Sequence, residues 1–288
     1  MRNSIVNVVD AQASPGLDHS SYRPIPRRLA LLVGVAAVGV LFAWIMGTPT
    51  GLMGKLDAVG YAICHRIDAR SFQINGIPMP LCARCTGIYL GVMTSFLVMF
   101  ASGRTRVSRL PPAKVIAVLV FFVAVMGFDG INSYIHLFPG ASGLYEPHNW
   151  LRLVTGMYCG VAMFNVVFPV FNGVVWRNAD PQRGINNLRE LAGLCAVAGC
   201  VVLLVLTERP VFLWVFGFLS TIGVVLILTM IGTVLFLSIT RFDRNAIAWR
   251  HLMIPLMAGL TIAVIEIGAI DIVRYALTGT WNGFPLGG

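Results

Sequence analysis

The stretch VFLWVFGFLSTIGVVLILTMIGTVLFLSI, residues 211–239, decides the fold class of this chain. It contains no charged side chain. A helix of about twenty apolar residues is long enough to cross the roughly 30 Å hydrocarbon core of a bilayer. A helix also satisfies its own backbone hydrogen bonds, which an isolated segment in lipid must do. The stretch therefore predicts a transmembrane helix.

Similar apolar runs recur along the whole chain. They begin near Leu29, Thr86, Ala113, Trp150, Leu191, Val211 and His251. Hydrophobic residues make up 57% of the 288 residues and charged residues only 11%, whereas soluble domains carry about 25% charged residues. We predict an all-α polytopic membrane protein with about seven transmembrane helices. The net charge of +9 lies in loops between spans, so nucleic acid is not an expected partner and membrane lipids are.

Basic residues are unevenly divided between alternate connections, and this division predicts the orientation. One set of connections carries the whole net charge of +9, whereas acids and bases balance in the other. Positively charged loops near span ends stay in the cytoplasm. We therefore expect a multi-pass protein of the cytoplasmic (inner) membrane with its N-terminus inside and its C-terminus outside. The basic set consists of Arg2, Arg23, Arg27, Arg28, Arg104, Arg106, Arg109, Lys114, Arg177, Arg183, Arg189, Arg241, Arg244 and Arg250.

The chain divides into three parts on this reading. Residues 1–28 form a flexible cytoplasmic tail, residues 29–276 the transmembrane domain, and residues 277–288 an outer tail. An extracytoplasmic loop, residues 47–85, separates the first two spans and includes an amphipathic helix from Lys55 to Ile67 resting on the membrane surface. Gly87, Gly91 and Gly156 are expected at close helix contacts.

The extracytoplasmic loop holds the ligand types that zinc prefers. A Cys-x-x-Cys pair directs two sulfurs to one point, and a nearby cysteine and histidine complete a tetrahedral set. We predict a metal site, most simply for zinc, on Cys64, His65, Cys82 and Cys85. Two other histidines on the same side, His136 and His148, compete for the fourth position.

The same thiols fit two other chemistries. Cys82 and Cys85 precede a predicted helix, whose N-terminal dipole, together with Arg84, favours thiolate as in redox-active pairs. A structural disulfide from Cys64 to either of them is also compatible with an oxidising outer compartment. The residues alone leave metal, disulfide and free thiols open.

These motifs carry a resemblance to a known family. The series Cys64-His65-Arg66, Arg70-Ser71-Phe72 and Cys82-Ala83-Arg84-Cys85-Thr86-Gly87-Ile88-Tyr89 resembles a family of predicted prokaryotic membrane proteins catalogued as a domain of unknown function. Asp129-Gly130 is similar to the family's Asp-Gly pair, and Asn132 is the nearest counterpart of the polar residue that follows it. An Asn-x-x-Arg-x-x-Thr-Gly pattern is matched by Asn149, Arg152, Thr155 and Gly156. The resemblance covers about Cys64 to Gly156 and implies a membrane location without an activity.

Ionisable side chains inside the predicted spans gather toward the outer half. Such groups are costly in a bilayer unless paired or hydrated, so each is a functional candidate. Asp129, Asn132 and His136 share one face of the third span. Glu266, Asp271 and Arg274 lie in the last span. Two buried ion pairs, Asp129 with Arg152 and Asp271 with Arg274, are the purely structural alternative to a site.

Three functions are compatible with this pattern. The first is a membrane protein whose metal site lies beside a polar pocket for a lipid-linked or other anionic substrate, with Asp129 or Glu266 as acid or base. The second is a thiol–disulfide oxidoreductase that uses Cys82 and Cys85 with a membrane quinone. The third is a non-enzymatic subunit of a membrane complex. In the first, the residues that hold the substrate are Arg66, Arg70, Arg84, Asn149 and Arg152.

Overall fold

The computed structural model describes residues 22–138 and 143–282. Most of the predicted N-terminal tail and the end of the predicted C-terminal tail lie outside these described residues. The helices are α1 (Arg27–Gly47), α2 (Gly51–Ile63), α3 (Ala83–Ala101), α4 (Ala113–Ile135), α5 (Asn149–Val175), α6 (Leu188–Leu206), α7 (Pro210–Thr240) and α8 (Met253–Thr278), with short 3-10 turns η1 (Asp68–Arg70) and η2 (Trp249–Leu252). The strands are β1 (Gln73–Ile74), β2 (Ile77–Pro78), β3 (Val107–Arg109) and β4 (Asp180–Arg183).

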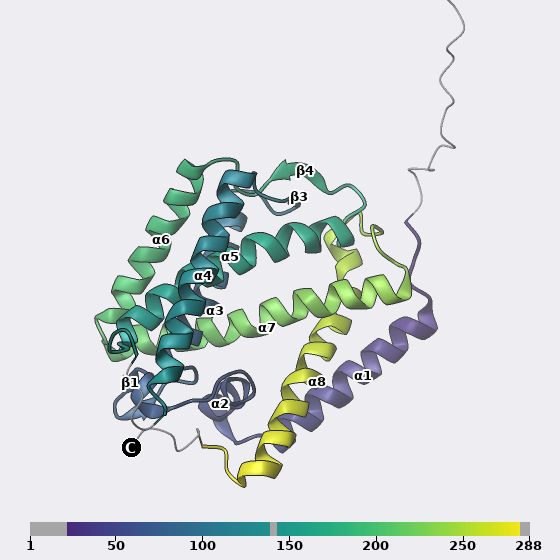
Figure 1. The fold of residues 1–288 in the computed structure, drawn as a ribbon. Coiled ribbons are helices and arrows are strands. Elements are labelled where there is room, and N and C mark those ends of the chain that lie inside the picture. The colour runs from purple at the N-terminus through teal and green to yellow at the C-terminus, as the bar shows by residue number, and fades with distance from the viewer. Residues whose placement is uncertain (1–21, 139–142, 283–288) are drawn as a thin grey trace, which may run out of the picture.

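The predicted all-α membrane architecture is confirmed. Within the described part of the chain, seven helices are long and apolar enough to cross a membrane. They begin within a few residues of the predicted starts, because each start coincides with the end of a polar or proline-containing connection. The helices are packed into a single bundle (Figure 1). Such a protein contacts membrane lipids along its exposed apolar faces.

Helices α3 and α5 are the most closely packed pair of the bundle. A Cβ atom on Gly160 of α5 would overlap the carbonyl oxygen of Ile88, and one on Gly91 of α3 would overlap that of Met157. The expected close contacts at Gly87, Gly91 and Gly156 are thus confirmed. Small residues spaced four apart let two backbones approach closely, which is how helices associate in lipid. This contact fixes how the start of α3 faces the start of α5.

The connections gather at two opposite ends of the bundle (Figure 1). At one end, β3 pairs in parallel with β4, with Val107 opposite Asp180. The amide of Arg177 donates to the carbonyl oxygen of Ala246 there. The basic connections predicted to be cytoplasmic therefore meet one another. The opposite end carries α2, η1 and the hairpin of β1 and β2, which pair antiparallel.

Helix α2 is the predicted amphipathic helix, displaced toward the N-terminus. It spans Gly51–Ile63 and buries Leu56, Val59 and Tyr61 against α7 and α8. Its last carbonyl groups lack partners inside the helix. The guanidinium of Arg274 on α8 donates to the carbonyl oxygens of Tyr61 and Cys64. This cap explains why the chain leaves the helix at Cys64 and not at the predicted Ile67.

Candidate metal centre and arginine network

Three cysteine side chains converge at the end of the bundle that carries α2. The sulfur atoms of Cys64, Cys82 and Cys85 all lie within 4.8 Å of one another, and we call this group the thiol cluster. Cys64 and Cys82 are buried. Three sulfurs this close around one point match the donor set of a tetrahedral zinc site with one position left for a fourth ligand.

Local backbone geometry brings these sulfurs together. Cys82 is the N-cap residue of α3 and Cys85 lies one turn later, so both side chains project from the same helix end. Cys64 arrives from the C-cap of α2. Its sulfur accepts hydrogen bonds from the backbone amides of Arg66 and Cys82, each at 3.4 Å. Amide donors to sulfur stabilise thiolate, the form that binds metal.

The thiols titrate as a group and not independently. Hydrogen bonds from the Cys64 and Cys85 thiols hold the pKa of Cys82 well below its usual value. The hydrogen bond to Cys82, together with burial, raises the pKa of Cys64 to about 12. A cation that binds this cluster would displace the remaining thiol protons.

His65 lies next to the thiol cluster without joining it in the described residues. The group of ligand atoms within 4.8 Å of one another contains the three sulfurs and no histidine nitrogen. Burial lowers the pKa of His65, so its ring favours the neutral form that can bind a metal. His136 faces elsewhere, because its Nδ1 lies 2.9 Å from the carbonyl oxygen of Asn132 on its own helix.

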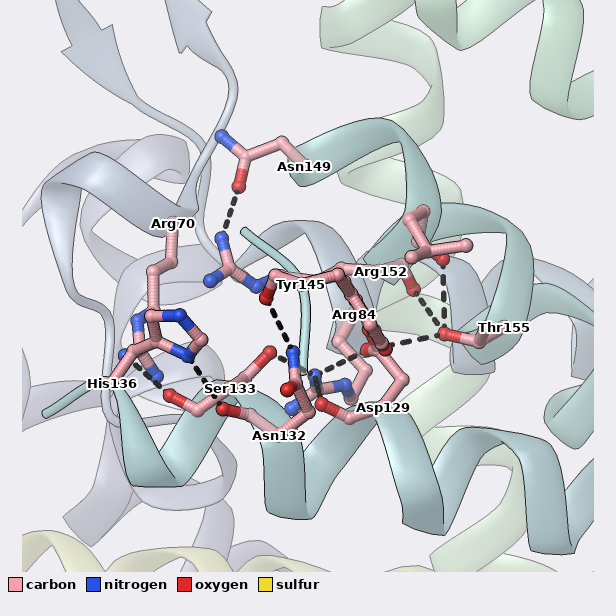
Figure 2. A network of polar contacts seen from close by, with 11 residues as sticks. Arg70, Arg84, Asp129, Asn132, Ser133, His136, Tyr145, Asn149, Arg152 and Thr155 are labelled. Carbon is pink, nitrogen blue, oxygen red and sulfur yellow. Dashed lines mark hydrogen bonds and ion pairs between the residues drawn. The ribbon is translucent and has the colours of Figure 1, made fainter. Parts of the chain in front are cut away.

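A second polar group surrounds Asp129 on α4, which is only 1% exposed. The guanidinium of Arg84 donates to the carboxylate at 2.5 Å and to the hydroxyl of Ser133 at 3.0 Å. The hydroxyl of Tyr145 donates to the other carboxylate oxygen at 2.8 Å. Figure 2 shows these side chains meeting around Asp129 from three separate segments of the chain.

Two further arginines lie against the same group. Arg70 donates to the carbonyl oxygen of Ser133 at 2.9 Å, and Arg152 donates to the side-chain oxygen of Asn149 at 2.8 Å. We call Arg70, Arg84 and Arg152, with Asp129, the arginine network. In the described residues, the buried Nε groups of Arg84 and Arg152 have no hydrogen-bond partner. The network therefore holds three cations against one carboxylate, with donors left over.

The thiol cluster and the arginine network are neighbours. Arg84 lies between Cys82 and Cys85 in the sequence, so the first turn of α3 contributes to both. Burial lowers the pKa of Arg70, and repulsion from Arg84 lowers it further, whereas the charge of Cys82 opposes this shift. A negatively charged thiolate centre therefore stabilises the adjoining arginines.

The ion pair expected between Asp129 and Arg152 is wrong. Asp129 pairs with Arg84 of α3 and not with Arg152, because α3 and α5 approach through glycine and present Arg84 to α4. Asp271 accepts a hydrogen bond from the indole of Trp44 at 3.4 Å. Arg274 follows Asp271 by one helical turn and donates to the carbonyl groups at the end of α2.

Two of the predicted site residues lie apart from the arginine network. Arg66 forms an ion pair with Asp57 of α2 at 2.8 Å. Glu266 is exposed on the outer face of α8. The predicted convergence of Arg70, Arg84 and Arg152 is observed, with Asn149 orienting one of them.

Two residues that contact the arginine network, Ser133 and Tyr145, were not singled out from the sequence. Ser133 follows Asp129 by four residues on α4, so helical spacing alone placed it on the same face. Tyr145 lies in the connection between α4 and α5, which Asn132 holds in place by accepting from the amide of Leu144 and donating to the carbonyl oxygen of Tyr145. No pattern in the sequence predicts that contact.

Comparisons with known proteins match the part of the chain that carries this site. A family model described as "Predicted membrane protein (DUF2085)" matches residues 64–166. An uncharacterized protein of Methanothermobacter thermautotrophicus is 37% identical over 101 residues, which are 35% of this chain and 80% of that protein. An uncharacterized protein of Methanocaldococcus jannaschii is 31% identical over 122 residues, which are 42% of this chain and 72% of that protein. No solved structure matches.

Proposed function

The chain belongs to the DUF2085 family of predicted membrane proteins, and we propose that it holds a zinc ion on Cys64, Cys82 and Cys85 beside an arginine site for an anionic head group. The convergence of three sulfurs within 4.8 Å of one another carries this proposal. His65 is the protein residue best placed to supply a fourth ligand. If it does, the metal is structural; if water or substrate takes that position, the site is open for chemistry.

The surroundings of the thiol cluster support a metal over three unreacted thiols. The sulfur of Cys64 accepts hydrogen bonds from two backbone amides. These donors favour the thiolate, which is the form that binds a metal. A Zn²⁺ ion on three thiolates leaves one net negative charge, which the neighbouring Arg70 and Arg84 offset. We place this end of the bundle outside the cytoplasm, because the basic connections lie at the opposite end.

Metal analysis of the purified, full-length protein tests the zinc proposal. We expect about one zinc per chain in the wild type and loss of most of it in Cys82→Ser, because serine is a poor zinc ligand. Cys159→Ser is the matched control, since Cys159 is a buried cysteine inside α5. It should retain the metal. Wild-type protein with no stoichiometric metal, grown in zinc-sufficient medium, contradicts the proposal.

The anionic ligand follows from the charge of the arginine network. The network contains three guanidiniums and one carboxylate, which only Arg84 contacts, and two buried Nε groups have no partner among the described residues. Arginine forks are suited to carboxylate and phosphate oxygens. In this proposal Asp129 anchors Arg84, while Arg70 and Arg152 bind the ligand. Three hydrogen-bond donors surround Asp129, so it serves as a positioning residue and not as the acid or base predicted above.

The ligand proposal is tested with Arg152→Gln. A lost hydrogen bond to a charged group costs about 1.5–3 kcal/mol, so we expect at least tenfold weaker binding. A polyprenyl phosphate and inorganic pyrophosphate serve as separate probes, which distinguishes a lipid head group from a soluble anion. Arg109→Gln, an exposed arginine at the opposite end, is the control and should bind as the wild type does. Equal affinity in Arg152→Gln and wild type overturns the assignment.

One observation favours a second function. Cys82 caps α3 and its pKa is lowered, which suits the attacking thiol of a redox pair. Oxidation of Cys82 and Cys85 would break two S–H bonds, form one S–S bond and pass two electrons and two protons to a quinone. The metal analysis separates the two functions, because a protein isolated with a disulfide in place of zinc supports the redox function and contradicts the zinc site.

A further inference from the structure

A groove of about 700 Å³ lies between α1 and α8, away from the thiol cluster and the arginine network. Helix α1 packs along α8 at the edge of the bundle (Figure 1), and only Val33 of α1 is buried. The groove is hollow because small residues face each other across it, among them Ala43 on α1 and Gly268 and Ala269 on α8. In a bilayer, lipid reaches it from the side.

The groove runs along α8 from Val264 to Ala276, a distance of about 18 Å at the helical rise of 1.5 Å per residue. Its inner part, toward Val264, is apolar. This part fits an acyl or isoprenoid chain. Val40 of α1 also lines the groove.

The other end of the groove is polar and aromatic. Asp271, 3% exposed, lines it together with Trp44, Tyr275 and Trp281. One carboxylate oxygen of Asp271 accepts from the indole of Trp44 at 3.4 Å. The other is buried and has no hydrogen-bond partner in the described residues. An ionisable group left unsatisfied within a span is costly, and a ligand that donates a hydrogen bond would remove that cost.

The charges around Asp271 favour a neutral donor over a cation. Lys55 lies 5.9 Å from the centre of the Trp44 ring, and Arg274 follows Asp271 by one helical turn. A cation one helical turn from the carboxylate, and a second one at the Trp44 ring, disfavour a further cation such as a lipid ammonium group. The groups left to bind a ligand are three aromatic rings and one carboxylate oxygen. A flat head group that stacks on the rings and donates a hydrogen bond from a hydroxyl matches them.

We propose that the groove between α1 and α8 binds an isoprenoid quinol, with the ring among Trp44, Tyr275 and Trp281, one hydroxyl donating to Asp271, and the chain lying toward Val264. The proposal concerns binding alone and does not rest on the thiol cluster. A carboxylate only accepts hydrogen bonds. The reduced ring therefore binds and the oxidised ring, which has only acceptors, is disfavoured.

The preference between the two redox forms provides the test. Decylubiquinol and decylubiquinone are titrated into the full-length protein in detergent, and tryptophan fluorescence reports binding. The wild type is expected to bind the quinol at least tenfold more tightly. Asp271→Asn introduces an amide donor, so the preference should disappear or reverse. Glu266→Gln makes the same chemical change on the exposed face of α8 and should keep the wild-type preference.

A second variant covers the case in which Asp271→Asn fails to fold. A Cβ on Gly268 lies 3.6 Å from the Trp44 ring, so Gly268→Phe fills the groove while leaving Asp271 in place. It should lose binding of both forms. The proposal is overturned if Asp271→Asn keeps the quinol preference, if Gly268→Phe binds as the wild type does, or if Asp271 instead governs retention of phosphatidylethanolamine without any quinol preference.

Discussion

The Asp129→Asn variant is expected to be less stable than the wild type by about 3–5 kcal/mol, the usual cost of breaking a buried ion pair by removing one partner. Arg84 then remains in the interior without its carboxylate, and the hydroxyl of Tyr145 loses the charged acceptor at 2.8 Å. At about 2–4 °C per kcal/mol, the thermal midpoint should fall by on the order of 10 °C. Thermal unfolding in detergent, followed by circular dichroism, measures this shift.

The partly exposed ion pair at the opposite end is the matched control. Arg104 and Glu190 are 2.6 Å apart, but their side chains are 34% and 32% exposed. Surface pairs contribute about 0–1 kcal/mol, so Glu190→Gln should barely change the midpoint. The double variant Arg84→Met with Asp129→Leu should recover part of the loss, because apolar replacement of both partners removes the unpaired charge. Equal losses in Asp129→Asn and Glu190→Gln would contradict the buried pair.

The spans and the thiol cluster could be predicted because their signals are local. An apolar run needs only its own residues to specify a helix in lipid. Cys82 and Cys85 are close because they are three positions apart at the start of one helix. Cys64 lies eighteen residues before Cys82, and α2 brings it to the pair. It was predicted as a ligand only because cysteine is a residue type that binds zinc.

The choice of ion-pair partners could not be predicted, since it depends on how helices are rotated about their axes. The sequence predicts that Arg84, Arg152 and Asp129 lie at the same depth in the membrane, but not in which direction each side chain points. The glycine contact between α3 and α5 turns Arg84 toward α4. On α8, the spacing of Asp271 and Arg274 allowed a pair within one helix. The carbonyl groups of Tyr61 and Cys64 at the end of α2 compete for Arg274, and they lie 213 and 210 residues earlier in the chain.

Removal of the proposed zinc should destabilise the end of the bundle that carries α2, not the helices as a whole. A ligand that binds only the folded state contributes about 4.1 kcal/mol when its free concentration is 1,000 times Kd. The three sulfurs join the end of α2 to the start of α3. Chelation should therefore lower the thermal midpoint and speed amide hydrogen exchange in residues 64–82, while exchange in the interior of α7 changes little.

The same experiment separates a metal from thiols that merely pack together. Cys82→Ser should show the fast exchange of the chelated wild type and no further response to the chelator, because both have lost the same link. Cys159→Ser should respond to the chelator as the wild type does, since its sulfur lies within α5 and outside the cluster. Should chelation leave exchange in residues 64–82 unchanged while Cys82→Ser accelerates it, the thiols stabilise this end by packing and hydrogen bonding without an ion. The arginine network would then lack a neighbouring zinc–thiolate centre, and its need for an anionic ligand would be greater.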